Sequence, residues 1–294
     1  MPCCFLSWLA PISLIAVLGC ANWEKRGVDL LSSTNEQLTD PSTQHASNRK
    51  RVILSVEFIN LSAGASLSAI DDESTQSLWQ WVDETSIDPG LRQAIMRNGI
   101  RVGFVSNEEA FRNQLGNKRI DRDLVETFLA EASIASDLAH GSEKLPMRLG
   151  RRYELPLRQP LEGSHVAIIR ANDQLIGKTL QHAQYVLALS GTRAVTPDQI
   201  QLKIHPEIQH GTTVQKWISS DTALRIDSRR ESWQLSALNL DLLVKEGDLL
   251  VIAPTQPLHG LAKHMLSGTG SDNQNEQLVL LIRVEQIPTL IAKL

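Results

Sequence analysis

The chain has 294 residues, of which 42% are hydrophobic and 21% are charged, a balance typical of a folded globular protein. Its net charge of −4 gives it no general attraction for nucleic acid, and its scattered basic pairs lack the interleaved aromatic residues of a base-stacking surface. All 3 cysteines (Cys3, Cys4 and Cys20) lie at the N-terminus, which excludes disulfides and cysteine-based zinc sites from the rest of the chain and suits an oxidising compartment.

The first residues have the pattern of an export signal. Residues 5–19 are uncharged and mostly apolar, too short for a membrane-spanning helix of about 20 residues but typical of a signal peptide, here 1–19. The segment ends in Val17-Leu18-Gly19-Cys20, which resembles the bacterial lipobox. That resemblance implies lipidation of Cys20, and Ala21 after it favours the outer membrane. An uncleaved anchor is the alternative, and it also places the body outside the cytoplasm.

Residues 20–50 then form the predicted anchor and tether. They are rich in Ser, Thr, Asn, Gln and Asp and poor in large apolar residues, a composition that indicates disorder. A tether of this length has a root-mean-square reach of roughly 30 Å. It would hold a folded body close to a membrane surface.

Residues 51–140 alternate strand and helix patterns. Apolar residues at every second position predict a strand over 51–61. A helix is expected over 88–99, with Asp88 as its cap, Pro89 in its first turn and Gly99 at its end. The other expected elements are helices over 71–84, 107–115 and 121–139 and a strand over 100–106. This part of the chain is predicted to be a small α/β domain.

Residues 147–294 read instead as strands separated by turn residues. Alternating β-branched residues and leucines predict nine strand segments, and only 260–266 has a helical pattern. We therefore expect an α+β protein, in which the small α/β domain precedes a mainly antiparallel all-β domain of sandwich or barrel type.

One stretch within this half, residues 201–211, carries His205, Glu207 and His210. In a strand, the period of two places Ile200, Leu202, Ile204 and Ile208 toward the core and His205 and Glu207 on the opposite face. Pro206 lacks an N–H and therefore indicates an edge strand or a bulge. The favoured interpretation is a solvated strand face. The alternative is a metal site formed by the two histidines and the glutamate, which would make the protein an exported metal-dependent hydrolase.

No other motif predicts catalysis. The sequence contains no G-x-S-x-G elbow and no P-loop, and no cofactor is expected. The loop 268–276 has oxygen-bearing side chains but no calcium-loop pattern, so it is interpreted as a turn. Trp79 and Trp81 lie two apart in an expected helix, where only one of them can face the core fully. They are the predicted partner contacts.

The order of blocks in the second half resembles the C-terminal β domain of bacterial secretins, which form rings in the outer membrane. The residues that carry this resemblance are LGRRYELP (149–156), VTPDQIQLKIHPEIQ (195–209), LDLLVKEGDLLVIAPTQ (240–256) and EQLVLLIRV (276–284). Ala253-Pro254 replace the double glycine of the family, and no spare pair of long hairpin strands is evident. The resemblance implies work in assembly or protein binding.

Together these patterns predict a non-enzymatic, membrane-anchored envelope protein. Its expected partners are the lipid membrane and an envelope protein or further copies of itself, with contacts through the strand 200–208 and the segment bearing Trp79. A small-ligand-binding β domain remains a further alternative.

Overall fold

The computed structural model describes residues 51–62, 78–116, 136–171, 173–220, 223–270 and 274–288, without the side chains of 216–227. The predicted signal peptide, Cys20 and the tether lie outside these residues. So do residues 71–77 of the helix expected over 71–84 and residues 121–135 of the helix expected over 121–139. Residues 46–294 form one compact unit.

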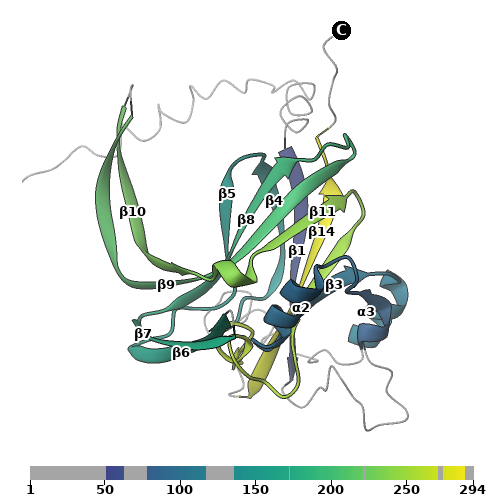
Figure 1. Ribbon diagram of the computed structural model, residues 1–294, viewed down its shortest axis with the longest axis horizontal. Helices are drawn as coiled ribbons and strands as arrows, with labels where there is room; N and C mark the ends of the chain where they lie inside the picture. Colours follow the sequence, from purple (N-terminus) through teal and green to yellow (C-terminus); the bar gives the residue numbers. More distant parts are fainter. Residues whose placement is uncertain are drawn as a thin grey trace, which may run out of the picture. The chain divides into compact units, whose positions relative to one another are not determined.

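The larger sheet draws its strands from both ends of the body (Figure 1). Its order is β2-β3-β12-β14-β1-β4, with β13 also paired to β14, and every pairing is antiparallel. Its strands are β1 (Arg51–Ser62), β2 (Val82–Asp83), β3 (Ile100–Val105), β4 (Gly141–Arg148), β12 (Leu249–Pro254), β13 (Ser267–Thr269) and β14 (Asn275–Gln286).

The second sheet has the order β10-β9-β8-β5, with β11 also paired to β9. Its strands are β5 (Arg152–Pro156), β8 (Gln184–Arg193), β9 (Gln199–Ser220), β10 (Ala223–Gln234) and β11 (Leu240–Lys245). A separate hairpin consists of β6 (Ser164–Ala171) and β7 (Gln174–Gln181).

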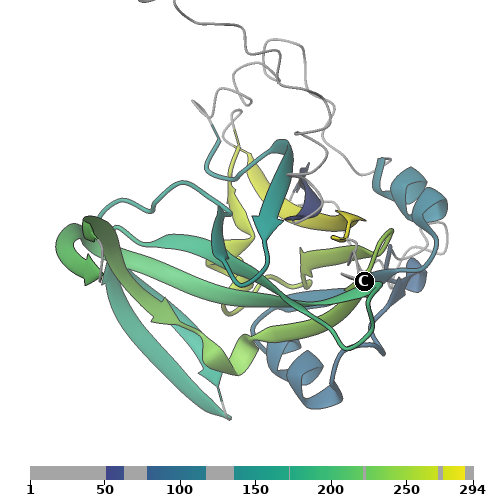
Figure 2. The ribbon, with the colours of Figure 1, turned by 90° about the horizontal axis from the view of Figure 1, so that it is seen from above.

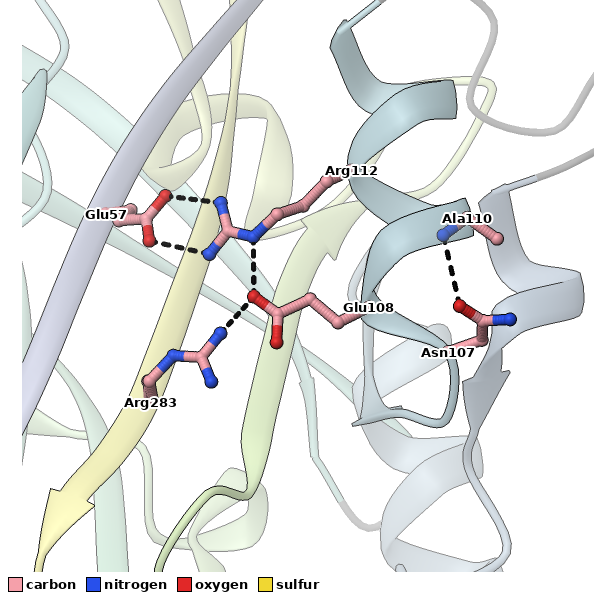
Figure 3. A network of polar contacts seen from close by, with 6 residues as sticks. All are labelled: Glu57, Asn107, Glu108, Ala110, Arg112 and Arg283. Carbon is pink, nitrogen blue, oxygen red and sulfur yellow. Dashed lines mark hydrogen bonds and ion pairs between the residues drawn. The ribbon is translucent and has the colours of Figure 1, made fainter.

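The helices are short, and α2 and α3 begin where the sequence predicts. The helix expected over 71–84 is not found over 82–83, where the chain forms β2. In α2 (Pro89–Met96) the Asp88 carboxylate accepts a hydrogen bond from the Leu91 N–H at 2.9 Å, which satisfies one of the free donors of the first turn. In α3 (Glu108–Gly116) the Asn107 side chain accepts from Ala110 in the same way at 3.1 Å (Figure 3). The remaining helical turns are η1 (Leu78–Trp81), η2 (Ser236–Leu238) and α5 (Ala262–Met265).

The strands β12 and β14 of the larger sheet are buried on both faces, whereas β4 at its edge is mostly exposed. In β12, Leu250 and Ile252 belong to the main core, which also contains the inward residues of the second sheet, whereas Leu249 and Val251 belong to a smaller cluster under α3 and η1. A strand covered on both sides reads as a continuous apolar run, as LLVIAP does.

Ion pairs hold α3 on this sheet (Figure 3). Arg112 of α3 donates two hydrogen bonds to Glu57 of β1, at 2.9 and 2.7 Å, and one to Glu108 at 2.6 Å. Arg283 of β14 also donates to Glu108. The hydrogen bond from Arg112 is the largest influence on Glu57 and lowers the pKa of its carboxyl group despite partial burial.

The predicted fold class is confirmed, since the structure is mainly antiparallel β with a small helical part. The boundary predicted near residue 140, however, falls inside the compact unit. β1 lies between β14 and β4, and β3 pairs with β12, so the predicted domains 51–140 and 147–294 share one sheet. Residues 141–146, expected to link the two, belong to β4. Periodicity reports which face of a strand is buried but not which strand lies beside it.

Candidate functional site

The stretch singled out by the sequence lies in the middle of β9, and Glu207 is its most enclosed polar residue. Only 2% of Glu207 is exposed. Its carboxylate accepts two hydrogen bonds from Arg152 of β5, at 2.6 and 2.8 Å, and a third from the Ser232 hydroxyl of β10 at 2.6 Å. The solvated face expected here is therefore wrong for Glu207, because the neighbouring strands supply side chains that cover it.

These contacts determine the charge state of Glu207. Burial, the largest influence, would raise its pKa, but the hydrogen bonds from Arg152 and Ser232 outweigh burial and lower the pKa overall. The Arg152 pKa is raised, first by its hydrogen bond to Glu207. The pair is thus ionised and saturated, which makes it a structural link across three strands.

The two histidines do not join Glu207 in a metal site. His210 lies beside Lys178 of β7 (3.3 Å from Nζ to Nε2) and 3.8 Å from the Glu231 carboxylate. Burial and the charge of Lys178 lower the His210 pKa, and a nearby ammonium group repels a metal ion. No group of three or more histidine, cysteine, aspartate or glutamate residues within the described ranges could hold a metal. The occupied Glu207 carboxylate argues against the hydrolase alternative.

The position of Pro206 corrects another expectation. β9 is not an edge strand, because β8 pairs along one side and β11, then β10, along the other. Pairing with β11 ends at Ile204 and pairing with β10 begins at Glu207. The Pro206 carbonyl, which accepts from Leu235 N–H at 3.2 Å, points into that gap. In a strand, the N–H and C=O of one residue point to the same side. The N–H that proline lacks would therefore also lie in the gap, and no hydrogen bond to a paired strand is lost.

Both predicted tryptophan contacts pack against the smaller core cluster. Trp79 is only 9% exposed, and the Arg101 guanidinium lies 4.1 Å from its ring centre. Trp81 is half-buried against the same cluster. Trp79 is therefore not a surface contact. It lies buried in the 3-10 turn η1, which β2 follows at Val82.

A feature that the sequence did not predict is the far half of the β9–β10 hairpin. From Val214 to Ser220, β9 pairs with β10 alone among the described strands. Figures 1 and 2 show this part, hereafter the arm (Val214–Ser220 and Ala223–Arg229), at the outer side of the second sheet, to which β9 and β10 belong. The expectation that no spare long hairpin exists is thus wrong. Its two strand patterns, 213–219 and 222–227, were visible in the sequence as neighbours separated by a short turn.

The arm is redirected at a bulge. His210 pairs with Glu231 and Val214 with Arg229, so three residues of β9 face one of β10. Gly211 in this bulge has a φ of 72°, which glycine tolerates best. The Arg230 side chain donates to the Gly211 carbonyl at 3.1 Å and also to the His182 carbonyl. A bulge bends its strand and re-aims the residues beyond it, so the arm leaves the body in a fixed direction.

A second cluster missed by the sequence joins β6, β8 and α5. His165 Nε2 lies 3.0 Å from the Tyr185 hydroxyl, and the His165 and His264 ring centres are 5.6 Å apart. The Arg158 guanidinium donates to the carbonyls of His264 and Ser267, at 2.8 and 2.9 Å. Burial is the main cause that lowers the pKa of both histidines and raises that of Tyr185.

A cavity between the two sheets in the described part of the chain is too small for an organic ligand. This apolar cavity, lined by Ile95, Leu187, Met265 and their neighbours, has a volume of about 20 Å³, enough for roughly one water molecule. Of the loop expected over 268–276, both ends lie in β13 and β14, where Thr269 pairs with Asn275, and residues 271–273 lie outside the described ranges.

Comparison with protein-family models, with curated proteins and with solved structures found no match for the chain. No helix in the described ranges is long and apolar enough to cross a membrane.

Proposed function

We propose that this is an exported envelope protein, anchored through Cys20, that works by binding or assembling with other proteins rather than by catalysis. The arm is the observation that carries the proposal. The saturated Glu207 and the resemblance of the second half to the secretin β domain also support it.

Among the described strands the arm pairs with no third strand, so the backbone groups along its outer edges are available to one. Isolated two-stranded hairpins are marginally stable in water, and free strand edges readily accept a further strand. The bulge at Gly211 holds the arm in one direction, which lowers the entropy cost of binding. Strand addition along the arm, by another envelope protein or another copy of this chain, is the proposed mechanism.

The test compares two exposed aliphatic residues of the second sheet. Val214, in the arm, is 45% exposed, and Leu243, on β11 in the body, is 57% exposed. Charged residues on a strand block pairing with another strand. We expect Val214→Lys to abolish complexes seen by cross-linking and by size-exclusion chromatography of detergent extracts, and Leu243→Lys to leave them intact.

Both variants should melt like the wild type, because neither site is buried. A wild-type protein that remains monomeric and partnerless in those extracts would overturn the proposal. So would stoichiometric zinc or manganese in the purified protein that is lost on His205→Ala, because that result favours the hydrolase.

A further inference from the structure

Four arginines gather at the end of the body where β1 begins. Arg51 and Arg148 are direct cross-strand partners in β1 and β4. Arg151 follows in the β4–β5 turn, where its N–H donates to the Arg148 carbonyl at 3.1 Å. In the same turn Gly150 N–H donates to the Gly191 carbonyl of β8 at 2.8 Å, two residues before Arg193.

These arginines lack counter-charges within the described ranges. None of the four forms an ion pair with a described carboxylate, and Arg148, Arg151 and Arg193 are exposed. Like charges directly opposite each other on two strands are destabilising, so the Arg51–Arg148 pair favours an external anion.

Three carboxylates lie in the turns at this end. Glu246 accepts from the Ile287 N–H at 2.6 Å and Asp248 from the Lys245 N–H at 2.9 Å. Asp198 is exposed in the same turn as Arg193. The first two accept hydrogen bonds from the backbone but keep their charge, so the four arginines outnumber the three carboxylates by one.

The sequence extends the basic cluster into the tether. Arg49 and Lys50 directly precede Arg51, so three consecutive basic residues mark the junction of tether and body. Val195 follows Arg193 and is fully exposed, at 105% of its reference area. Basic residues around an exposed aliphatic side chain suit a surface that is anionic outside and apolar beneath.

We propose that this end of the body, hereafter the basic end (Arg51, Arg148, Arg151, Arg193 and Val195), docks on an anionic lipid bilayer. Clusters of four to eight basic residues beside a membrane attachment bind anionic headgroups, with about a fivefold gain in affinity for each residue. The proposal rests on the membrane anchoring proposed above and adds an orientation to it. The tether enters at this end, so it holds the arginines within reach of the bilayer to which Cys20 would attach.

A membrane is favoured over an acidic protein as the partner of the basic end. The tether would keep the bilayer near this surface at all times, and so at a high effective concentration. Docking would also fix which parts of the body point away from the bilayer. β8 runs about 30 Å from Gln184 to Arg193, and the β6–β7 hairpin contacts its first residues through His165 and Tyr185. That hairpin would therefore face away from the lipid.

The experiment uses mature protein extracted from the envelope and reconstituted in vesicles. A signal-cleaved, lipidated chain has no free thiol, so one introduced cysteine can carry a fluorophore. The probe is placed at Val195→Cys in the basic end, and at Leu175→Cys, 65% exposed in the hairpin, as its matched control. Vesicles of phosphatidylcholine alone are compared with vesicles containing phosphatidylglycerol, both doped with a nitroxide-labelled lipid that quenches by contact.

We expect quenching at position 195 only in the phosphatidylglycerol vesicles, with loss at high salt, and no quenching at position 175 in either. Arg148→Gln, Arg151→Gln and Arg193→Gln combined should lower the ratio of docked to undocked protein roughly a hundredfold. These side chains are exposed, so the variant should fold, and an unchanged thermal melt verifies this.

Each failure has its own signature. Protein that does not float with any vesicle refutes the anchor. Protein that floats with both lipids while position 195 remains unquenched refutes docking and leaves the anchor and the assembly function standing. Quenching that persists in the triple variant refutes the role of the arginines, and cross-linking of position 195 to a protein instead of lipid assigns the surface to a protein partner.

Discussion

Glu207 is charged and almost fully enclosed because three hydrogen bonds replace the water it loses. Two of them come from Arg152, 55 residues earlier in the chain, and one from Ser232. A buried carboxylate without such partners would take up a proton. The apolar members of the same strand obey simple alternation, since Ile200, Leu202 and Ile204 are all at most 1% exposed. Whether a residue on the polar face of a strand is buried depends on the side chains that the neighbouring strands place over it.

His165 and His264 should make stability depend on pH. Burial is the largest cause that lowers the pKa of both. Arg158 lowers the His165 pKa further, and His165, Lys263 and Arg158 lower the His264 pKa further. Tyr185 and Asp137 also face the cluster, through His165 and Arg158 respectively. In the unfolded chain the histidines bind protons near pH 6.5. Below that pH the histidines of the unfolded state bind protons while those of the folded state remain neutral. The free energy of unfolding therefore decreases as the pH is lowered, until the pH passes the lower pKa values of the folded state.

Urea unfolding between about pH 7 and pH 5 measures this loss, which is at most about 1.4 kcal/mol per pH unit for each histidine. The carboxyl groups with lowered pKa (Glu57, Glu108 and Glu207) lose their contribution only at lower pH. His165→Gln with His264→Gln should lower the slope of the profile, and the slope that remains should come from His210, whose pKa is also lowered. An equal slope in the double variant and the wild type would contradict this assignment.

At the scale of elements, α3 depends on its ion pairs with the sheet. Arg112→Met would remove both hydrogen bonds from Glu57 and leave Glu108 only the one from Arg283. Both carboxylates are less than half exposed. Hydrogen bonds to charged groups contribute about 1.5–3 kcal/mol each, and partial exposure reduces the loss, so we expect destabilisation of about 1–3 kcal/mol. Urea unfolding measures the loss, and α3 amides should exchange faster with solvent.

The matched control is Glu285→Gln, which removes the partner of the exposed Lys144 on the same sheet. Exposed pairs of this kind contribute less than about 1 kcal/mol. If both substitutions cost the same, the network in Figure 3 has no special role in holding α3.

Elements that depend on local chemistry could be predicted from the sequence. The cap at Asp88, the proline after it and the glycine at φ 79° are all local signals, and α2 lies between them. The pairing of β1 with β14 could not be predicted, because it joins residues more than 200 positions apart and many apolar strands would fit there equally well. The arm was not predicted for a related reason, since its strands were expected separately but not as a hairpin that leaves the body.

At the scale of the whole molecule, the N-terminal part of the body completes the sheet of the C-terminal part. β1 fills the position between β14 and β4, and β3 covers the free side of β12. Val251 and Leu281 are buried against Phe111 of α3 in one cluster, so the last strands of the chain need the early helices on their outer face. The two parts should therefore fold as one cooperative unit.

A fragment of residues 150–294 tests this directly, because it begins in the β4–β5 turn and retains the whole second sheet. It lacks β1, β3 and α3, and would expose the backbone edges and the apolar outer face of β12 and β14, including Leu249 and Val279. An uncovered apolar sheet face of this kind favours aggregation. We expect no cooperative thermal transition by circular dichroism for this fragment alone.

Co-expression with residues 46–149 should restore a soluble complex that melts as one unit. If the fragment alone melts cooperatively near the temperature of the intact protein, two independent domains are the correct description. The shared sheet would then be an interface between them.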